Sequence, residues 1–246
     1  MYRVAFILLG LSSNLVAQNI NGVDTGPAAI STTVAQCLLQ NGYKLFAGRI
    51  GKTTGTVDNV GITNIQNALA AGIPYVHAYI MPNAQHDAAT QVQNALNALG
   101  STKVNVLWLD IENSQYQQWS TDTSTNQQFF VDLWNAAVPY AGKSFDYLGV
   151  YSFKTQWDPV MGDTFNAGLP ATTPIWWARY NSNTDPCGGW ENFALWQNGC
   201  PSFAIHQYCC LTTKNICGVG PFDTSTAAWA GWQDFRNTSQ ISRARI

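Results

Sequence analysis

The sequence carries little charge and no excess of either sign. Lys and Arg together number 12, Asp and Glu number 14, and charged residues make up 11% of the 246 residues. Because nucleic-acid binding depends on clustered cations that neutralise phosphates, this balance argues against a nucleic-acid partner. A hydrophobic fraction of 46% with a formal charge of -2 also excludes a disordered chain. The chain should therefore fold, and its partner should not be a polyanion.

Motifs that would identify several common classes are also missing. No phosphate loop of the form Gly-x-Gly-x-x-Gly or Gly-x-x-x-x-Gly-Lys-Ser/Thr follows a predicted strand, which excludes the usual nucleotide sites. No Cys-x-x-Cys pair occurs and the three histidines are scattered, so we expect neither a metal nor another cofactor. The absence of a Gly-x-Ser-x-Gly elbow argues against a Ser-His-Asp hydrolase.

The N-terminal hydrophobic run is too short to cross a membrane. It follows Arg3 at residues 4–11 and is about half of the roughly 20 residues that a spanning helix needs. Polar residues and Leu15-Val16-Ala17 come next, a pattern typical of a secretory signal peptide. We expect a signal peptide at residues 1–17 and a single domain at residues 18–246. The mature chain should be a monomer without a membrane anchor, secreted or delivered to a lysosome or digestive vacuole.

All six cysteines lie beyond the expected cleavage point. An even number of cysteines in a secreted chain indicates disulfides. Five of the six fall between residues 187 and 217, so the C-terminal third should be cross-linked while the rest depends on its hydrophobic core. Their connectivity stays open, because six cysteines allow 15 pairings. The six are Cys37, Cys187, Cys200, Cys209, Cys210 and Cys217.

Strand-like and helix-like segments alternate through the first 150 residues. The strand-like runs lie at residues 20–24, 43–50, 73–80 and 104–111, and the helical patterns at residues 30–40, 62–69, 88–99 and 126–138. Gly42, Gly72 and Gly100 stand where helices should end, and their spacings of 30 and 28 residues are typical of β-α repeats. This order predicts a parallel sheet.

The last third continues the strands but not the helices. Strand-like runs follow at residues 147–151, 174–180, 203–208 and 218–223, while helical patterns shrink beyond Ser152. Eight strands with about five good helices predict an α/β fold, namely an irregular TIM-like β/α barrel with reduced helices in the C-terminal third. An open doubly wound sheet is the alternative.

In the segment at residues 106–112, a hydrophobic strand ends in two carboxylates, Asp110 and Glu112. Residues i and i+2 of a strand point to the same side, roughly 6.6 Å apart at Cα. Glycoside hydrolysis uses two such acids, about 5–5.5 Å apart in retaining enzymes and about 6.5–9.5 Å apart in inverting ones. The spacing fits both geometries. The carboxyl ends of strands are also where barrel enzymes place their active sites.

Two more acids close the first and last predicted strands, Asp24 and Asp223. In a closed barrel these strands are neighbours, so four carboxylates would crowd together and raise the pKa of at least one. We expect Glu112 to be the protonated acid. The alternative for Asp24 is a helix N-cap, and Asp223, beside Thr224, has a similar alternative.

Aromatic residues are abundant, with 10 Trp, 10 Tyr and 11 Phe. They are too many for all to be buried, and flat apolar rings suit the faces of sugars. A carbohydrate substrate is therefore favoured, on the composition as well as on the paired acids.

Six motifs occur in one order along the chain. They are Gly22-Val-Asp24, Ala71-Gly-Ile-Pro-Tyr-Val-His-Ala-Tyr79, Val106-Leu-Trp-Leu-Asp-Ile-Glu112, Leu148-Gly-Val-Tyr-Ser152 with Gln156-Trp-Asp-Pro159, Ile175-Trp-Trp-Ala-Arg-Tyr180 and His206-Gln-Tyr208. Together they resemble the glycoside hydrolase family 25 lysozymes, the Chalaropsis type, and most closely their invertebrate and amoebal branch. The resemblance covers essentially the whole mature chain.

The resemblance implies an irregular β/α barrel that cleaves peptidoglycan as a muramidase with net retention. The general acid of the family falls on Glu112, its partner carboxylate on Asp110 and its first-strand acid on Asp24. The last-strand acid falls on Asp223, but one residue is inserted before it. Because a one-residue slip reverses the direction of a side chain, a bulge at Pro221 would be needed to restore it.

The same resemblance places sugar-contacting side chains at the ends of other strands. These are the aromatic residues Tyr79, Tyr151 and Trp177, together with Gln207 of the His206-Gln-Tyr208 motif. Each aromatic residue has the alternative of a core position. The expected partner is the peptidoglycan polysaccharide, and the expected role is antibacterial defence or the digestion of bacteria.

Two other functions are alternatives for a barrel with these acids. A family 18 chitinase would need an acid where Trp108 stands, so that mechanism lacks an essential carboxylate. A sugar-binding barrel that has lost its activity is the alternative from another class. The presence of both Asp110 and Glu112 argues against it.

Overall fold

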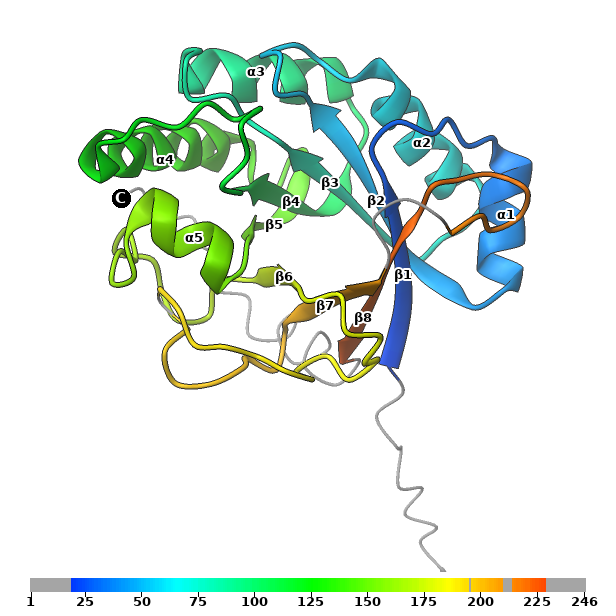
Figure 1. Cartoon of the computed structure of the whole chain (residues 1–246). Coiled ribbons are helices and arrows are strands. Elements are labelled where there is room, and N and C mark those ends of the chain that lie inside the picture. The colour runs from blue at the N-terminus through cyan, green and yellow to red at the C-terminus, as the bar shows by residue number, and fades with distance from the viewer. Residues whose placement is uncertain (1–18, 195, 210–213, 229–246) are drawn as a thin grey trace, which may run out of the picture.

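Eight strands close into a barrel in the computed structural model, which describes residues 19–194, 196–209 and 214–228 (Figure 1). The strands are β1 Asn19–Thr25, β2 Tyr43–Gly51, β3 Tyr75–Ile80, β4 Val104–Asp110, β5 Phe145–Tyr151, β6 Ile175–Ala178, β7 Ile205–Cys209 and β8 Asp223–Ala228. They pair in chain order, and β8 closes on β1. The predicted barrel is confirmed, and the open sheet is wrong. The expected signal peptide at residues 1–17 lies outside the described residues.

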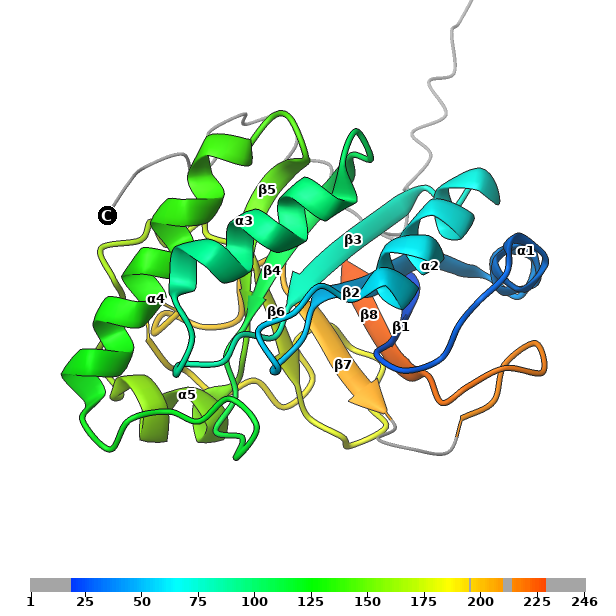
Figure 2. The ribbon, with the colours of Figure 1, turned by 90° about the horizontal axis from the view of Figure 1, so that it is seen from above.

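Helices follow the first five strands and pack on the outside of the barrel (Figures 1 and 2). They are α1 Thr32–Gln40, α2 Asn59–Ala70, α3 Ala88–Leu99, α4 Thr123–Ala137 and α5 Lys154–Met161, with a short 3-10 turn at Val138–Tyr140. None of the helices in the described part of the chain is both long and apolar enough to cross a membrane.

Polar caps and glycines set the limits of these helices. The side chains of Ser31, Asp58, Asp87 and Asp122 each accept a hydrogen bond from the first turn of the helix that follows. Gly42 and Gly72 then take φ values of 86° and 81° just after α1 and α2. Such left-handed backbone favours glycine, because a Cβ atom strains it. The capping role expected for these glycines is confirmed.

The last strand differs from the prediction in position and direction. β8 begins at Asp223 and runs antiparallel to both β1 and β7, so the expected strand at residues 218–223 and the all-parallel sheet are wrong. Residues 216 and 219 form an isolated antiparallel bridge instead, in a turn that precedes the strand. Pro221 lies before β8 and marks no bulge in it. In the pairing of β7 with β8 the register irregularity falls in β7, between Gln207 and Cys209.

Within the described ranges, disulfides and aromatic side chains, not helices, cover the strands β6–β8. Among the described residues no helix lies between β6 and β8, and Figure 1 shows loops on that side of the barrel. Cys187 and Cys200 close a loop between β6 and β7, while Cys37 of α1 is bonded to Cys217 before β8. Cys209 is disulfide-bonded as well. The expected cross-linking of the C-terminal third is confirmed.

Two hydrophobic clusters result from the alternation of side chains along each strand. One cluster fills the space between the strands and the helices, and the other fills the barrel itself. Trp108 is fully buried in the inner cluster. Gly149 on the neighbouring strand makes room for it, since a Cβ there would lie 2.5 Å from the Trp108 ring. The barrel is therefore a packed core, and a substrate can reach only its ends.

Candidate active site

Inward-facing residues at the carboxyl ends of β1–β5 and β7 meet at one end of the barrel. Since the strand side chains alternate, each lies two residues after a residue of the inner layer, such as Trp108 before Asp110 or Ile205 before Gln207. The set is Asp24, Arg49, Tyr79, Asp110, Tyr151 and Gln207. Barrel enzymes carry their chemistry at this end.

Asp223 joins this set because β8 runs backwards. In the antiparallel register Asp24 is directly opposite Asp223, so the first residue of β8 meets the end of β1. Residues opposite each other in an antiparallel pair point to the same face of the sheet. The predicted neighbourhood of the two acids is therefore confirmed, although the expected direction of the strand is not.

Asp24 takes part in a buried hydrogen-bond network rather than capping a helix. Its Oδ1 accepts a hydrogen bond of 2.9 Å from Nε2 of Gln207. The Oε1 of Gln207 accepts from the hydroxyls of Tyr151 at 2.8 Å and Tyr180 at 3.0 Å. Ser31 caps α1, so the N-cap alternative for Asp24 is wrong. The network fixes the position of Asp24 from two other strands.

Gln117 holds the backbone that carries the two central acids. Its side chain is fully buried; Nε2 donates to the carbonyl oxygen of Asp110 at 2.6 Å, and Oε1 accepts from the amide N–H of Glu112 at 2.8 Å. The indole N–H of Trp119 donates to the carbonyl oxygen of Glu112 at 2.6 Å and also to Gln117. These bonds hold the backbone in place just beyond the end of β4. No neighbouring strand pairs with Glu112 in the described register.

Burial and mutual repulsion raise the pKa values of three carboxyl groups. Burial, then the charge of Asp223, raises the pKa of Asp24 well above its usual value, although the hydrogen bond from Gln207 opposes this. Burial and the charges of Glu112 and Asp24 raise the pKa of Asp110. Burial and the charge of Asp223 raise the pKa of Glu112. The cluster therefore cannot be fully ionised without cost, and it retains a proton to higher pH than isolated carboxyls would.

Arg49 is a cation at the end of β2, on the same side of the barrel as the acids. Its Nε donates to Asp58 at 2.8 Å, and its Nη2 donates to the carbonyl oxygen of Gly26 at 3.4 Å. Its positive charge lowers the pKa of Asp110, against the larger effects of burial and Glu112. Arg49 thus opposes part of the rise in the pKa of Asp110. Arg49 was not among the residues predicted from the sequence, although a cation at the end of a buried strand was a usable signal.

The expected aromatic residues do not all reach the acids. Tyr79 and Tyr151 lie inside the barrel, where both contact the Trp176 ring edge-on at centroid distances of 6.1 and 4.8 Å. Both are nearly buried, so they form the floor of the site. Tyr180, whose side chain reaches Gln207, is 42% exposed and offers a ring at the surface.

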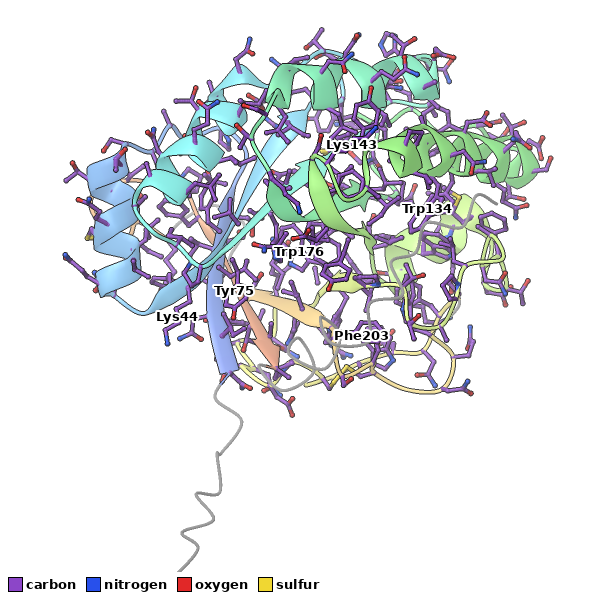
Figure 3. All side chains as sticks on the ribbon, turned by 180° about the vertical axis from the view of Figure 1, so that it is seen from behind. Lys44, Tyr75, Trp134, Lys143, Trp176 and Phe203 are labelled. Atoms are coloured by element: carbon purple, nitrogen blue, oxygen red, sulfur yellow. A yellow bond between two sulfur atoms is a disulfide. The ribbon has the colours of Figure 1, made fainter. Side chains whose placement is uncertain are left out.

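Trp177 faces the other way from Trp176 because adjacent strand residues point to opposite sides. Its ring stacks on His206 at 4.1 Å, and its indole N–H donates to the carbonyl oxygen of Pro186. It therefore lies in the outer cluster and does not join the acids. Of these two neighbours, Trp176 belongs to the inner cluster, together with Trp108 (Figure 3). The alternation of the strand could have separated the two, had one inward residue of β6 been known.

Known proteins resemble this chain over most of its length. The model of the family described as lysozyme-like protein 1 matches residues 16–208. Lysozyme-like protein 5 of Caenorhabditis elegans is 31% identical, covering 87% of this chain and 94% of its own. Probable GH family 25 lysozyme 2 of Dictyostelium discoideum is 32% identical, covering 89% and 97%.

Solved structures share the same fold. A muramidase from Trichobolus zukalii has a TM-score of 0.60 at 19% identity, over 91% of this chain and 99% of that chain. A family 25 glycosyl hydrolase from Bacillus anthracis has a TM-score of 0.64 at 14% identity, over 90% and 93%. With its barrel, its paired acids at the end of β4 and these relatives, the chain belongs to the glycoside hydrolase family 25 lysozymes.

Proposed function

We propose that the protein is a secreted, monomeric muramidase that hydrolyses the glycan of bacterial peptidoglycan with Glu112 as its general acid. The observation that carries this is the meeting of Glu112, Asp110, Asp24 and Asp223 at one end of the barrel. Membership of the lysozyme family and the names of its relatives support the substrate. Disulfides support secretion, since they persist in oxidising compartments.

The reaction uses a proton and a fixed negative charge. Glu112 transfers its proton to the glycosidic oxygen, the bond from that oxygen to the anomeric carbon breaks, and the leaving sugar departs as an alcohol. The carboxylate of Asp110, with Asp24 or Asp223, stabilises the positive charge on the anomeric carbon. A water molecule then adds to that carbon and returns a proton to Glu112.

Clearing of a peptidoglycan suspension by the wild type and by Glu112→Gln tests this assignment. The substitution keeps the shape of the side chain and removes the transferable proton, so the rate should fall by about 100-fold or more. Asp132→Asn, on the exposed face of α4, is the matched control and should keep the wild-type rate. Circular dichroism checks that all three proteins fold.

An inactive but folded wild type would favour the sugar-binding barrel instead. Equal rates for the wild type and Glu112→Gln would remove Glu112 from the mechanism. Secretion is tested separately by expressing the whole chain in a eukaryotic host. Mass spectrometry of the medium should find a mature protein that begins at Gln18, and retention of the uncleaved chain in the cells would contradict it.

A further inference from the structure

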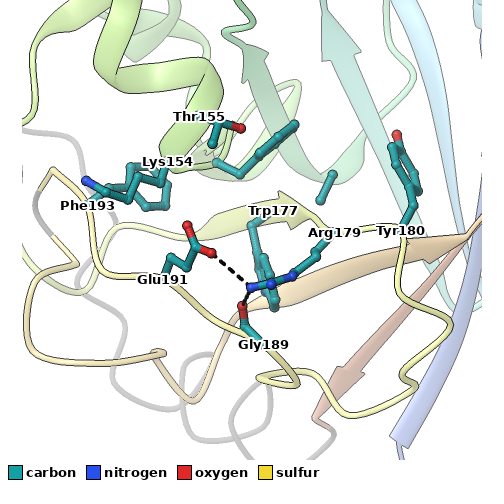
Figure 4. A pocket seen from close by; sticks show the side chains of 10 residues that line it. Lys154, Thr155, Trp177, Arg179, Tyr180, Gly189, Glu191 and Phe193 are labelled. Carbon is teal, nitrogen blue, oxygen red and sulfur yellow. Dashed lines mark hydrogen bonds and ion pairs between the residues drawn. The ribbon is translucent and has the colours of Figure 1, made fainter.

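The structure contains a pocket of about 290 Å³, whose lining side chains are drawn in Figure 4. Three segments form it: the start of α5 after β5, the end of β6 with the two residues beyond it, and residues 189–193 of the loop that follows. Because the first two segments lie at the carboxyl ends of β5 and β6, they are at the same end of the barrel as the acids. None of the four acids lines the pocket, but Tyr180 of its lining is hydrogen-bonded to Gln207 of the site.

Tyr180 is shared between the pocket and the cluster. It lines the pocket, and its hydroxyl donates to the same Gln207 amide that binds Asp24. The charges of Asp223, Asp24 and Glu112 all act on Tyr180, which places its side chain within their field. Tyr180 therefore connects the pocket with the site of the acids.

The loop that forms one wall is held in place before any ligand binds. The disulfide between Cys187 and Cys200 closes it. Inside the loop, Trp190 contacts Trp177 at a centroid distance of 5.2 Å and Phe193 at 5.7 Å. Binding to such a preformed wall needs little ordering of the chain, which favours affinity.

The lining combines an apolar floor with charges of both signs. Phe153, Trp177 and Phe193 supply rings. At the rim, Arg179 donates from Nη1 to Glu191 at 3.0 Å, and Lys154 contacts Asp158 at 2.6 Å outside the lining. The side chains of the Arg179 and Glu191 pair are about half exposed. Exposed ion pairs contribute little to stability, so a charged ligand can exchange partners with them at small cost.

Neutral sugar rings do not need such charges, whereas the peptide of peptidoglycan does. That peptide is attached through the lactyl group of the muramic acid, and it carries carboxylates, the amine of a diamino acid and small apolar side chains. We propose that this pocket binds the peptide attached to the glycan, with Arg179 and Lys154 contacting its carboxylates and Glu191 its amine. This inference rests on the proposed function and makes the enzyme selective for peptide-bearing glycan.

The test compares two substrates made from one preparation of solubilised glycan strands, one intact and one stripped of its peptides by an amidase. The measured quantity is the ratio of kcat/KM on intact strands to that on stripped strands. For the wild type this ratio should be about 10 or more, since one charge-assisted hydrogen bond can supply that factor. In Arg179→Met and in Lys154→Met it should fall towards 1.

Lys103→Met is the matched control. Lys103 forms an exposed ion pair with Asp146 at 2.6 Å, but it lies before β4, at the opposite end of the barrel. Its ratio should equal that of the wild type. A wild-type ratio near 1, or an unchanged ratio in both pocket variants, would overturn the peptide site. A wild type inactive on both substrates would overturn the proposed function, and the peptide site with it.

Discussion

The two parts of the barrel, β1–β5 and β6–β8, have their outer faces covered in different ways. Strands β1–β5 are each followed by a helix, and aliphatic and aromatic side chains fill the layer between strands and helices. Around β6–β8 the described residues contain no such helix, and disulfides with stacked rings cover the strands instead. A closed barrel therefore does not need eight covering helices, provided that cross-links limit the freedom of the loops.

The site lies across the junction of these two parts. Asp24, Asp110 and Glu112 come from the helical part, whereas Gln207 and Asp223 come from the cross-linked part. Asp24 belongs to the helical part, but its position also depends on the cross-linked part, because it lies opposite Asp223 and accepts a hydrogen bond from Gln207. Changes in either part should therefore affect catalysis. Loss of a disulfide should act by lowering the stability of the fold, whereas a change near the acids of the helical part should act by displacing them.

The largest expected effect comes from the bond that joins the two parts. Cys37→Ser combined with Cys217→Ser removes a cross-link between residues 180 apart in sequence. In the chain-entropy view this lowers the free energy of unfolding by about 5 kcal/mol. Urea denaturation of the double variant measures it. A loss below about 1 kcal/mol would show that the helical part alone maintains the closed barrel.

A smaller and more local loss is expected from Cys187→Ser combined with Cys200→Ser. This bond spans 13 residues and should contribute about 3 kcal/mol. Amide hydrogen exchange should accelerate in the loop between β6 and β7, while α1–α4 keep their protection. Equal acceleration in all helices would mean that the two parts of the barrel unfold as one unit.

Gln117→Glu tests the geometry of the helical part. An oxygen would replace the Nε2 that donates to the Asp110 carbonyl, so the backbone between Asp110 and Glu112 should shift. We expect kcat to fall by about 100-fold with little change in KM, because misplacement by about 1 Å costs a factor of this order. The added negative charge should also raise the pKa of Glu112 and extend activity to higher pH.

Gln115→Glu provides the control for this effect. Gln115 is exposed and lies two residues earlier in the same loop. It receives the same new charge without the two buried hydrogen bonds. If both variants lose activity equally, the charge and not the geometry is responsible, and Gln117 is not a positioning residue.

The smallest effect expected is a gain in stability from Asp24→Asn. The folded state raises the pKa of Asp24, so its stabilising contribution is complete at acidic pH and lost as the pH rises through the folded pKa. At pH 7 the neutral amide should therefore raise the unfolding temperature by a few degrees, at roughly 2–4 °C for each kcal/mol. Activity should fall in the same variant.

The gain from Asp24→Asn should disappear near pH 3, where the wild-type carboxyl is protonated as well. Asp146→Asn, a change at an exposed carboxylate, should not produce it. Thermal unfolding followed by circular dichroism at both pH values distinguishes these outcomes. A gain that persists in acid would mean that repulsion and burial at Asp24 are not its cause.

Local patterns were sufficient to predict the first four helices. The helical spacing of hydrophobic residues and the glycine that follows placed α3 at residues 88–99, where the structure has it. The end of β4 was also readable, because two acids after a buried strand form a pattern that needs no knowledge of distant contacts.

The cross-linked part could not be predicted as well, because its structure depends on partners far along the chain. The direction of β8 depends on its pairing with β1, and nothing near Asp223 indicates that pairing. Which of Trp176 and Trp177 faces inward depends on the register with Tyr151. Gln117 is one glutamine of several in a polar loop, and only its burial against Asp110 distinguishes it.

The amide of Gln207 has one further consequence, for spectroscopy. Two tyrosine hydroxyls donate to its oxygen, so its nitrogen must face Asp24, and its orientation in the barrel is set. One side-chain N–H therefore points directly at a carboxyl group whose charge changes with pH. The nitrogen and proton resonances of this single amide should follow the titration of the cluster, and they offer a label-free view of the site from within the protein.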